Sequence, residues 1–539
     1  MSHHQRSKTK LATTIAGLLL SAASLSAHAA TASFDSATAT IDLPVLEIAS
    51  GSNSPAFHAT FSLVNNAGTT ELQLASATPV DNIDGQRNTF DPTTQALHIA
   101  ALPFNGQEYY AKLKLIPNTN PLRFSVEQFV NNAFEGCPSF ATAGPTSGSC
   151  LLTGTYTQDI TLTRNIQWIL NGAVFIGDDK TNSATLTINP GTEIFGQQGA
   201  DYLWIRRGSK IMSEGTPSDP VVMSGPEQLS PGEWGGLVIA GYSHVNGCNA
   251  SDTICEVPFE AITSESYGGD NLADNSGVLK YTQILFAGFQ VRPDEELNGL
   301  TLLSVGSGTT IDYVQVHAGS DDGVEMFGGT PQLKHMVLTN NNDDSLDWGG
   351  GWTGKAQFVL IKQAADDGDR GIEADNFKSN PDIAPRSNPT LVNMTLLGSS
   401  AGSQGILLRR GTGVSIHNSV FTGFGSSCLR IDGDATYAFA GTPGNLSGGL
   451  TIENSYVNCN TNFTDEADKL FLVSDWFNTQ PGNHAGDPQL NGYLPAAGSP
   501  LLTGGAPIQG DAFFEATNYV GAFKDANDDW AKGWTFPFQ

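Results

Sequence analysis

The chain has 539 residues, enough for several average domains or for one long repetitive architecture. It carries 26 Lys and Arg against 54 Asp and Glu, and the formal net charge of -28 excludes nucleic acid and anionic membranes as natural partners, since both call for a basic face. Cations are the natural counter-partners of such a chain. Its 60 glycines are typical of a turn-rich extracellular β protein rather than of a helical enzyme.

Residues 1–29 have the pattern of an export signal. A charged stretch precedes the apolar segment LATTIAGLLLSAASLSA, which ends at the small-x-small cleavage site Ala27-His28-Ala29. We therefore expect an exported protein that is outer-membrane-associated, periplasmic or extracellular. No later run reaches the roughly 20 apolar residues that a span needs, so we expect no transmembrane segment in the mature chain. No Cys follows the cleavage site, and we expect no lipid anchor there.

Residues 31–130 predict a small β module or a pair of such modules. The stretch FDSATATIDLPVLEI, from Phe34, is similar to FDPTTQALHIAALPF, from Phe90. Each is followed by a strand of alternating polar and apolar residues, starting at Phe57 and at Tyr109. Such alternation marks half-buried antiparallel strands. We expect this region to be a spacer or a binding module rather than a catalytic unit.

Residues 150–460 repeat one pattern of short β-rich runs separated by Gly, Asn and Asp. This repetition predicts an all-β chain with a right-handed parallel β-helix, whose coils stack about 4.8 Å apart. The aromatic-rich region 461–539 is expected to cap the last coil. Equivalent inward positions follow each other at steps of 22, 25, 34, 24 and 36 residues, at Ile311, Leu333, Phe358, Val392, Ile416 and Ile452.

Six cysteines in an exported chain predict disulfides. We expect local pairs, because each of them closes a loop rich in Gly, Ser or Asn or joins neighbouring repeats. Six cysteines allow fifteen connectivities, and the others stay open. The expected pairs are Cys137 with Cys150, Cys248 with Cys255, and Cys428 with Cys459.

Two acidic motifs lie 22 residues apart: HAGSDDGVEMFGG starts at His317, and TNNNDDSLDWGG starts at Thr339. On the predicted coils an outward acid follows an inward apolar residue, and a pair of aspartates occupies the preceding turn. Unit charges 4.8 Å apart repel by roughly 0.9 kcal/mol in water, so stacked acids need neutralisation. Calcium, which takes six to eight oxygen ligands, would supply it. The candidate ligands are Asp321, Asp322, Glu325, Asp343, Asp344, Asp347, Asp366, Asp367, Glu373 and Asp375.

Two other interpretations of these acids stay open. Asp and Asn side chains can cap β-helix turns through bonds to the backbone, without any ligand. Paired carboxylates can also catalyse cleavage of an acidic polysaccharide, with Arg409 or Arg430 as the proton-handling partner on the following coils. Trp348 and Trp352 flank the acids and offer indole faces for sugar rings.

Several stretches resemble an exported bacterial β-helix family that is related to the leptospiral outer-membrane lipoproteins. They include GEWGGLVIAG, NDDSLDWGGGWTGKAQFVLIKQ, GIEADN and TNYVGAFKDANDDWAKGWTF, and the resemblance covers roughly residues 150–539. It implies fold and surface location rather than an activity. We therefore expect a cell-envelope or extracellular protein with a non-catalytic binding or structural role, its acidic coils stabilised by calcium. Its partner would be a polysaccharide or an envelope protein. The alternative is a carbohydrate-active enzyme, a polysaccharide lyase or glycoside hydrolase.

Overall fold

The computed structural model describes residues 31–49, 54–66, 68–80, 88–197, 199–249, 252–292, 295–402 and 404–538. The expected export signal lies outside them. The described chain forms two compact units, one up to residue 136 with the short segments 163–166 and 216–219, and one that contains the rest. In the described ranges no helix combines the length and apolar character needed to cross a membrane.

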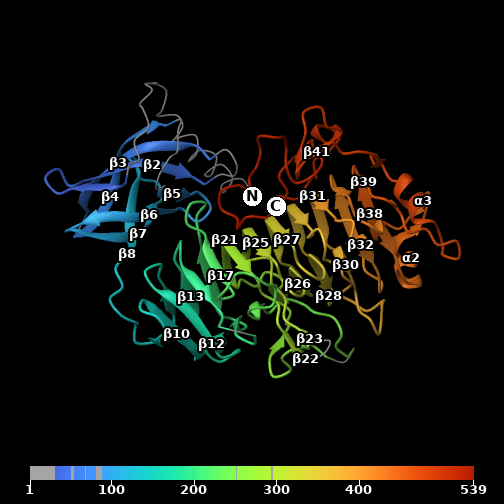
Figure 1. Ribbon diagram of the computed structural model, residues 1–539, viewed down its shortest axis with the longest axis horizontal. Helices are drawn as coiled ribbons and strands as arrows, with labels where there is room; N and C mark the ends of the chain where they lie inside the picture. Colours follow the sequence, from blue (N-terminus) through green and yellow to red (C-terminus); the bar gives the residue numbers. More distant parts are fainter. Residues whose placement is uncertain are drawn as a thin grey trace. The chain divides into compact units, whose positions relative to one another are not determined.

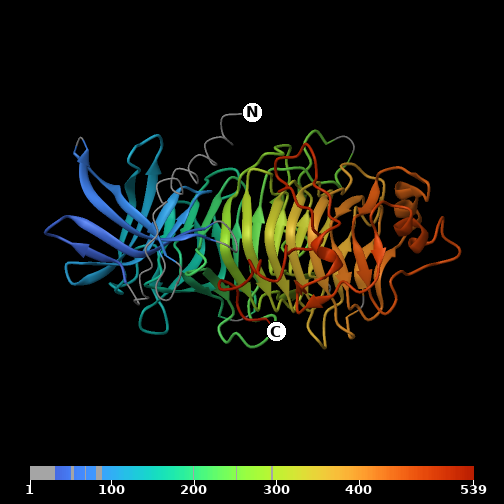
Figure 2. The ribbon, with the colours of Figure 1, turned by 90° about the horizontal axis from the view of Figure 1, so that it is seen from above.

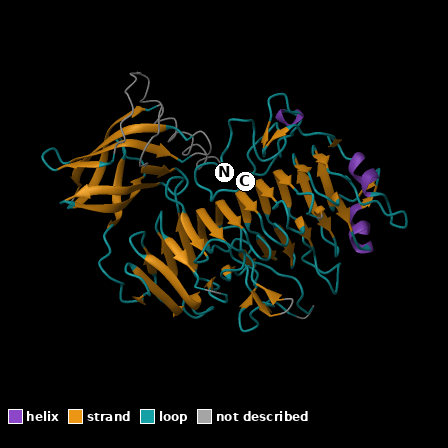
Figure 3. Cartoon of the chain, viewed as in Figure 1, coloured by secondary structure: helices purple, strands orange, loops and turns teal. Residues whose placement is uncertain are grey.

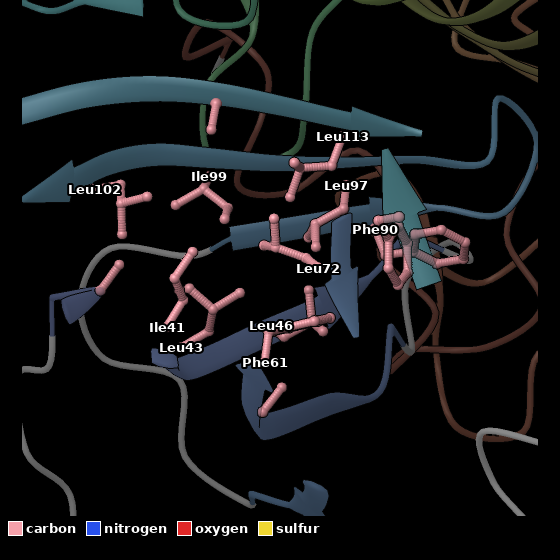
Figure 4. Packing of buried hydrophobic residues seen from close by; sticks show 14 of the residues in the cluster. Ile41, Leu43, Leu46, Phe61, Leu72, Phe90, Leu97, Ile99, Leu102 and Leu113 are labelled. Carbon is pink, nitrogen blue, oxygen red and sulfur yellow. The ribbon is translucent and has the colours of Figure 1, made fainter. Parts of the chain in front are cut away.

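The N-terminal unit is a barrel-like antiparallel sheet in the order β1-β2-β3-β4-β8-β7-β6-β5, which a parallel pairing of β2 with β5 closes. Its strands are β1 (Ser33–Asp35), β2 (Thr40–Ile48), β3 (Ala56–Asn66), β4 (Thr69–Pro79), β5 (Asn88–Asp91), β6 (Ala96–Phe104), β7 (Gln107–Ile116) and β8 (Arg123–Asn131). The predicted alternation holds in β3, where Ala59 and Phe61 are buried and His58 and Thr60 are not. Inward side chains such as Ile41, Leu97 and Leu113 meet in one apolar core (Figure 4).

The second unit is a right-handed parallel β-helix of three sheets, as the repeats predict (Figure 1). It begins with β9 (Thr142–Ala143), β10 (Ser149–Tyr156) and β12 (Gln167–Ile176). Sheet A contains β11 (Ile160–Leu162), β13 (Thr185–Ile188), β16 (Lys210–Glu214), the first halves of β21 (Gly277–Leu285), β25 (Thr310–His317), β27 (Gln332–Thr339), β29 (Lys355–Lys362) and β31 (Thr390–Leu397), and then β33 (Val414–His417) and β38 (Leu450–Glu453).

Sheet B contains β14 (Glu193–Phe195), β17 (Val221–Ser224), the second halves of the same five long strands, β34 (Val420–Thr422), β39 (Tyr456–Asn458) and β40 (His484–Ala485). Sheet C contains β15 (Tyr202–Ile205), β18 (Gly236–Ala240), β24 (Leu300–Leu303), β26 (Val324–Phe327), β28 (Leu346–Gly349), β30 (Arg370–Ala374), β32 (Gln404–Leu408) and β35 (Ser427–Ile431). Four small hairpins complete the β structure: β19 (Val257–Pro258) with β20 (Ser266–Tyr267), β22 (Gln290–Arg292) with β23 (Glu295–Glu296), β36 (Gly441–Thr442) with β37 (Asn445–Leu446), and β41 (Leu490–Asn491) with β42 (Leu494–Pro495).

The register agrees with the predicted repeat at its ends and differs in the middle. Ile311 pairs with Leu333, and Ile416 pairs with Ile452, as expected. Leu333, however, pairs with Ala356, which in turn pairs with Leu391, so the predicted inward positions Phe358 and Val392 are wrong by two residues and by one.

The reason is a bend between sheets A and B at which the backbone turns left-handed. Phe358 has φ 60° there, and its ring lies 5.0 Å from that of His335, which itself lies 4.2 Å from Tyr313. Aromatic side chains therefore stack along the bend. In the sequence this outer stack has the same spacing as the row of inward side chains, so alternation alone cannot separate the two. The stack starts at Tyr281, and asparagines occupy the bend in the later coils, at Asn393, Asn418 and Asn454.

Two different segments accompany the last coils of the β-helix. The short helices α2 (Asp434–Ala440) and α3 (Val473–Asn478) lie at the end (Figure 3), where Trp476 of α3 donates a hydrogen bond to the carbonyl of Leu450. After the 3-10 helix η1 (Pro500–Leu502) the chain turns back along the side of the coils (Figure 2). The aromatic residues near the C-terminus, which we expected to cover the last coil, therefore cover the aromatic stack instead, with Trp530 5.1 Å from His335 and Trp534 5.7 Å from Tyr281.

All three expected disulfides are confirmed: Cys137–Cys150, Cys248–Cys255 and Cys428–Cys459.

Candidate functional site

The acidic ladder lies on three consecutive strands of sheet C. Glu325 of β26 pairs with Asp347 of β28, which pairs with Glu373 of β30, as the sequence predicts. The preceding apolar residues of these strands point into the core and are fully buried, because side chains alternate along a strand. The alternation therefore places three acids directly above one another on the outer face.

A second row of the ladder precedes the strands. Asp322 and Asp344 occupy equivalent positions, and the backbone N–H of Asp344 donates a 3.0 Å hydrogen bond to Asp322 Oδ1. Between them Gly323 allows close stacking, since a Cβ there would lie 2.5 Å from the carbonyl oxygen of Ser345. On the third coil the equivalent position is occupied by Arg370. Ile372 pairs with Leu346, and Arg370 and Asp344 each lie two residues before them.

The expected position of Asp366 and Asp367 in this row is therefore wrong. Counted between paired residues, the third turn (363–371) contains three more residues than the second (340–345), and both aspartates are exposed on it. Asp369, which sequence analysis did not select, takes the ladder position after Asp343. Counting back from the outward acid Glu373, rather than matching the Asp-Asp pairs, would have identified it.

Four groups of three carboxylates have oxygen atoms within 4.8 Å of one another. Neighbouring groups share members, so the acids form one continuous cluster over three coils. The groups are Asp321, Asp322 and Asp343; Asp322, Glu325 and Asp347; Asp343, Asp344 and Asp369; and Asp344, Asp347 and Glu373.

Burial makes this cluster costly in the absence of a cation. Asp322 is 6% exposed and Asp344 is 3% exposed. Burial, followed by the neighbouring carboxylate of Asp347, raises the pKa of Asp322 well above its usual range. Burial and Asp343 raise the pKa of Asp344 to about 8. Burial and nearby carboxylates also raise the pKa values of Glu325 and Asp347 well above their usual range.

Among the described residues, the basic side chains near the ladder lie on the third coil and on the coil after it. Arg370 Nη1 lies 2.9 Å from Glu373 and 3.6 Å from Asp344. Arg409 contacts both Glu373 and Asp375, and Arg410 lies 2.5 Å from Asp375. Asp375 thus belongs to an arginine cluster rather than to the carboxylate groups, and its pKa is raised by burial to about 6 although Arg410 opposes the rise.

Apart from the contact of Arg370 with Asp344, the more buried acids of the first two coils have no such compensation. In the described part of the chain, no Lys or Arg forms an ion pair with Asp322, Glu325 or Asp347; Asn298, which sequence analysis did not select, donates a 2.7 Å hydrogen bond to Glu325 Oε2. Asp344 Oδ1 and Asp347 Oδ1 are buried and accept no hydrogen bond from any described residue. These carboxylate oxygens fit a hard cation, which prefers oxygen ligands.

Turn capping accounts for only part of the acidic motif. Asp322 Oδ1 and Asp367 Oδ1 accept backbone N–H bonds, the second from Gly368 at 2.9 Å. Capping explains neither the unpartnered oxygens of Asp344 and Asp347 nor the stacked position of Glu325.

The expected sugar-binding role of two tryptophans is wrong. Trp348 and Trp352 are fully buried, because Trp348 lies one residue after the outward Asp347 and so points inward. Their indole N–H groups donate to Thr412 Oγ1 and to the carbonyl of Pro331.

The two predicted arginines lie in different surroundings. Arg409 contacts the end of the acidic ladder, as described above. Arg430 is in the predicted register with Glu373, but Leu407 lies between them and its guanidinium is 3.7 Å from Glu466.

Residues 154–535 match the model of a family described as the pectate-lyase-like β-helix domain. A comparison with curated proteins found no match. Among solved structures, pectate lyase Pel9A is 13% identical with a TM-score of 0.28, and the match covers 68% of this chain and 89% of that chain. Tailspike protein 2 of bacteriophage CBA120 is 11% identical with a TM-score of 0.26, covering 68% of this chain, and this chain spans only half of the tailspike's length. The periplasmic alginate epimerase AlgG is 10% identical with a TM-score of 0.23, covering 60% and 81%.

These solved structures are too distant to carry an argument about function. The family model, in contrast, extends over most of the chain and includes all three strands of the acidic ladder. This chain belongs to the pectate-lyase-like β-helix domain family.

Proposed function

We propose that this protein is an exported β-helix that binds a calcium ion in its acidic ladder and uses the occupied face to hold an acidic polysaccharide without cleaving it. The observation that carries the proposal is the group formed by Asp322, Glu325 and Asp347. Its three carboxylates converge within 4.8 Å, and no basic side chain among the described residues pairs with them.

The charge distribution favours the first two coils as the cation site. Arg370 occupies on the third coil the position that Asp322 and Asp344 hold on the first two, and together with Arg409 it compensates Glu373. The protein thus has its own cations at one end of the ladder and needs an external one at the other. Calcium fits because it accepts six to eight oxygen ligands in flexible geometry.

A bound cation would also explain how such a face holds a polyanion. With the ion in place, the carboxylates of an acidic polysaccharide can complete its coordination instead of being repelled. The expected location is the cell envelope or the extracellular space, in keeping with the export signal at residues 1–29 and the three disulfides. The proposed relation to the leptospiral lipoproteins rests on the sequence motifs and concerns location only.

The test is thermal unfolding in millimolar calcium and in chelator. Calcium binds the folded ladder only, so at a hundredfold excess over Kd it should add about 2.7 kcal/mol to the free energy of unfolding. The unfolding midpoint should rise accordingly. Asp347→Asn should abolish the shift, because Asp347 belongs to two of the carboxylate groups.

Asp366→Asn is the matched control, since it removes the same charge from an exposed turn of the same region. It should leave the calcium shift unchanged. Equal midpoints in calcium and in chelator for the unaltered protein would refute the cation site.

A second candidate, a polysaccharide lyase, is favoured by one observation. Burial and the adjacent Arg410 lower the pKa of Arg409, which is the direction that a proton acceptor needs. Incubation of the purified protein with acidic polysaccharides in calcium should yield no new unsaturated or reducing ends. Their appearance, and their loss in Arg409→Lys, would establish the enzyme instead.

A further inference from the structure

We infer that a pocket beside the acidic ladder binds a single sugar unit through its hydroxyl groups. The pocket has a volume of about 450 Å³, within the range of about 300–1,000 Å³ that is usual for small-molecule sites. Two insertions form it, one between β18 and β21 and the other between β30 and β31. The inference rests on the proposed function only in taking the larger ligand to be a polysaccharide.

The inner end of the pocket is fixed by a buried asparagine. Asn246 is 3% exposed, and its Nδ2 donates to Asn376 Oδ1 at 2.9 Å and to the carbonyl of Pro385 at 3.1 Å. Its Oδ1 accepts nothing from the described residues, and exchanging the two amide atoms would not help, because both neighbours are acceptors. That oxygen is enclosed by protein atoms, so Asn246 is a fixed part of the pocket wall, and a ligand can reach only the polar groups at the more exposed part.

The remaining walls match the mixed character of a sugar. Asn249, Asp252 and Asn380 add amide and carboxylate groups at the more exposed part. Ile383 and Pro385 add apolar surface, which suits the C–H face of a pyranose ring. No basic side chain lines the pocket, so its chemistry selects hydroxyl groups rather than a carboxylate.

The pocket is held in shape before any ligand arrives. The disulfide between Cys248 and Cys255 closes one of the insertions and forms part of the wall. Asp252 Oδ2 accepts the backbone N–H of Asn249 at 3.0 Å within the same loop. A preorganised site loses less conformational entropy on binding than a mobile loop does.

Direct contacts connect the pocket to the acidic ladder. The backbone N–H of Asn246 donates a 2.8 Å hydrogen bond to the carbonyl of Gly350, three residues after Asp347. Its side chain bonds to Asn376, which follows Asp375 directly. These bonds fix the pocket wall to the ends of β28 and β30, the strands on which Asp347 and Glu373 lie.

The test is ligand-observed NMR titration of the full chain with cellobiose, maltose, lactose and digalacturonate. At least one disaccharide should bind with a Kd on the order of 1 mM, in chelator as well as in calcium, because no residue of the carboxylate groups lines the pocket. Ala384→Trp, which fills the pocket from an exposed position, and Asn380→Ala should each weaken binding by at least about tenfold. Unchanged unfolding midpoints would show that both variants fold.

Asn491→Ala is the control, since it removes an exposed amide from β41, outside the pocket. It should bind like the unaltered protein. Asp347→Asn should lose the calcium shift and keep disaccharide binding, so the two proposals fail separately. Absence of binding by all four disaccharides, or equal binding by Ala384→Trp, would overturn the inference.

Discussion

At the scale of single residues, strand alternation decides where each acid lies and burial decides what its charge costs. Asp347 lies between Leu346 and Trp348, both inward and fully buried, so its carboxylate faces outward. Asp322 and Asp344 are nevertheless buried and Asp347 is half-buried, and burial is the main cause of the raised pKa values of all three. An outward direction thus does not imply exposure to water.

These pKa values predict an unusual dependence of stability on pH. The pKa of Asp344 is about 8 in the folded protein and about 3.9 in an unfolded chain. Between these values the cation-free folded protein holds protons that the unfolded chain has lost, so the free energy of unfolding should fall as pH rises from about 4 to about 8. Circular dichroism melts at pH 5, 6, 7 and 8 in chelator should show steadily lower midpoints.

Calcium should remove this dependence, because it binds the ionised carboxylates and takes the place of the protons. The same melts in millimolar calcium should show no fall over this range. A midpoint in chelator that rises with pH would contradict the raised pKa values.

At the scale of elements, the bend between sheets A and B and the strands beside it bind the returning C-terminal segment. Buried amide side chains there bond to its backbone. Gln357 donates to the carbonyl of Glu515 at 2.9 Å and accepts its N–H at 2.8 Å. Gln315 makes the same pair of bonds to Phe536. These side-chain amides therefore pair with backbone groups of the C-terminal segment in the way that a neighbouring β-strand would.

Gln357→Leu tests this contact. It removes the two hydrogen bonds to Glu515 and a longer one to Asn393 Oδ1, and it leaves the N–H and the carbonyl of Glu515 unpaired. The free energy of unfolding should therefore fall by about 2 kcal/mol in urea denaturation. Gln332→Leu is the control, because the half-buried side chain of Gln332, one coil earlier, has no hydrogen bond to any described residue. Equal losses in both variants would show that the amide bonds contribute nothing.

At the scale of the whole β-helix, the disulfides close loops of unequal length. Cys428–Cys459 joins the last coils over 31 residues, whereas Cys248–Cys255 closes a loop of 7. The entropy that a cross-link removes from the unfolded chain grows with loop length.

Replacing each pair by serine should therefore have unequal effects. Loss of Cys428–Cys459 should lower the free energy of unfolding by about 1 kcal/mol more than loss of Cys248–Cys255, as measured by urea denaturation of the two double variants. A larger loss for the 248–255 pair would show that loop entropy does not govern these bridges, and would support a structural role of that bridge in the pocket wall.

The sequence by itself determined the features that depend on local periodicity. The repeat of apolar and polar residues predicted the parallel β-helix and the stacking of Glu325, Asp347 and Glu373, because strand alternation and coil length fix both. Cysteine spacing predicted the three disulfides for the same local reason.

Only the tertiary structure decided what depends on turn length, burial and distant segments. The longer third turn moved Arg370 into the acidic row and left Asp366 outside it, and matching of Asp-Asp pairs cannot show this. The left-handed bend at Phe358 follows from the pairing of neighbouring coils, which alternation does not reveal. The pocket beside the ladder depends on two insertions about 130 residues apart, as in the bond of Asn246 to Asn376, and no local pattern encodes such a meeting.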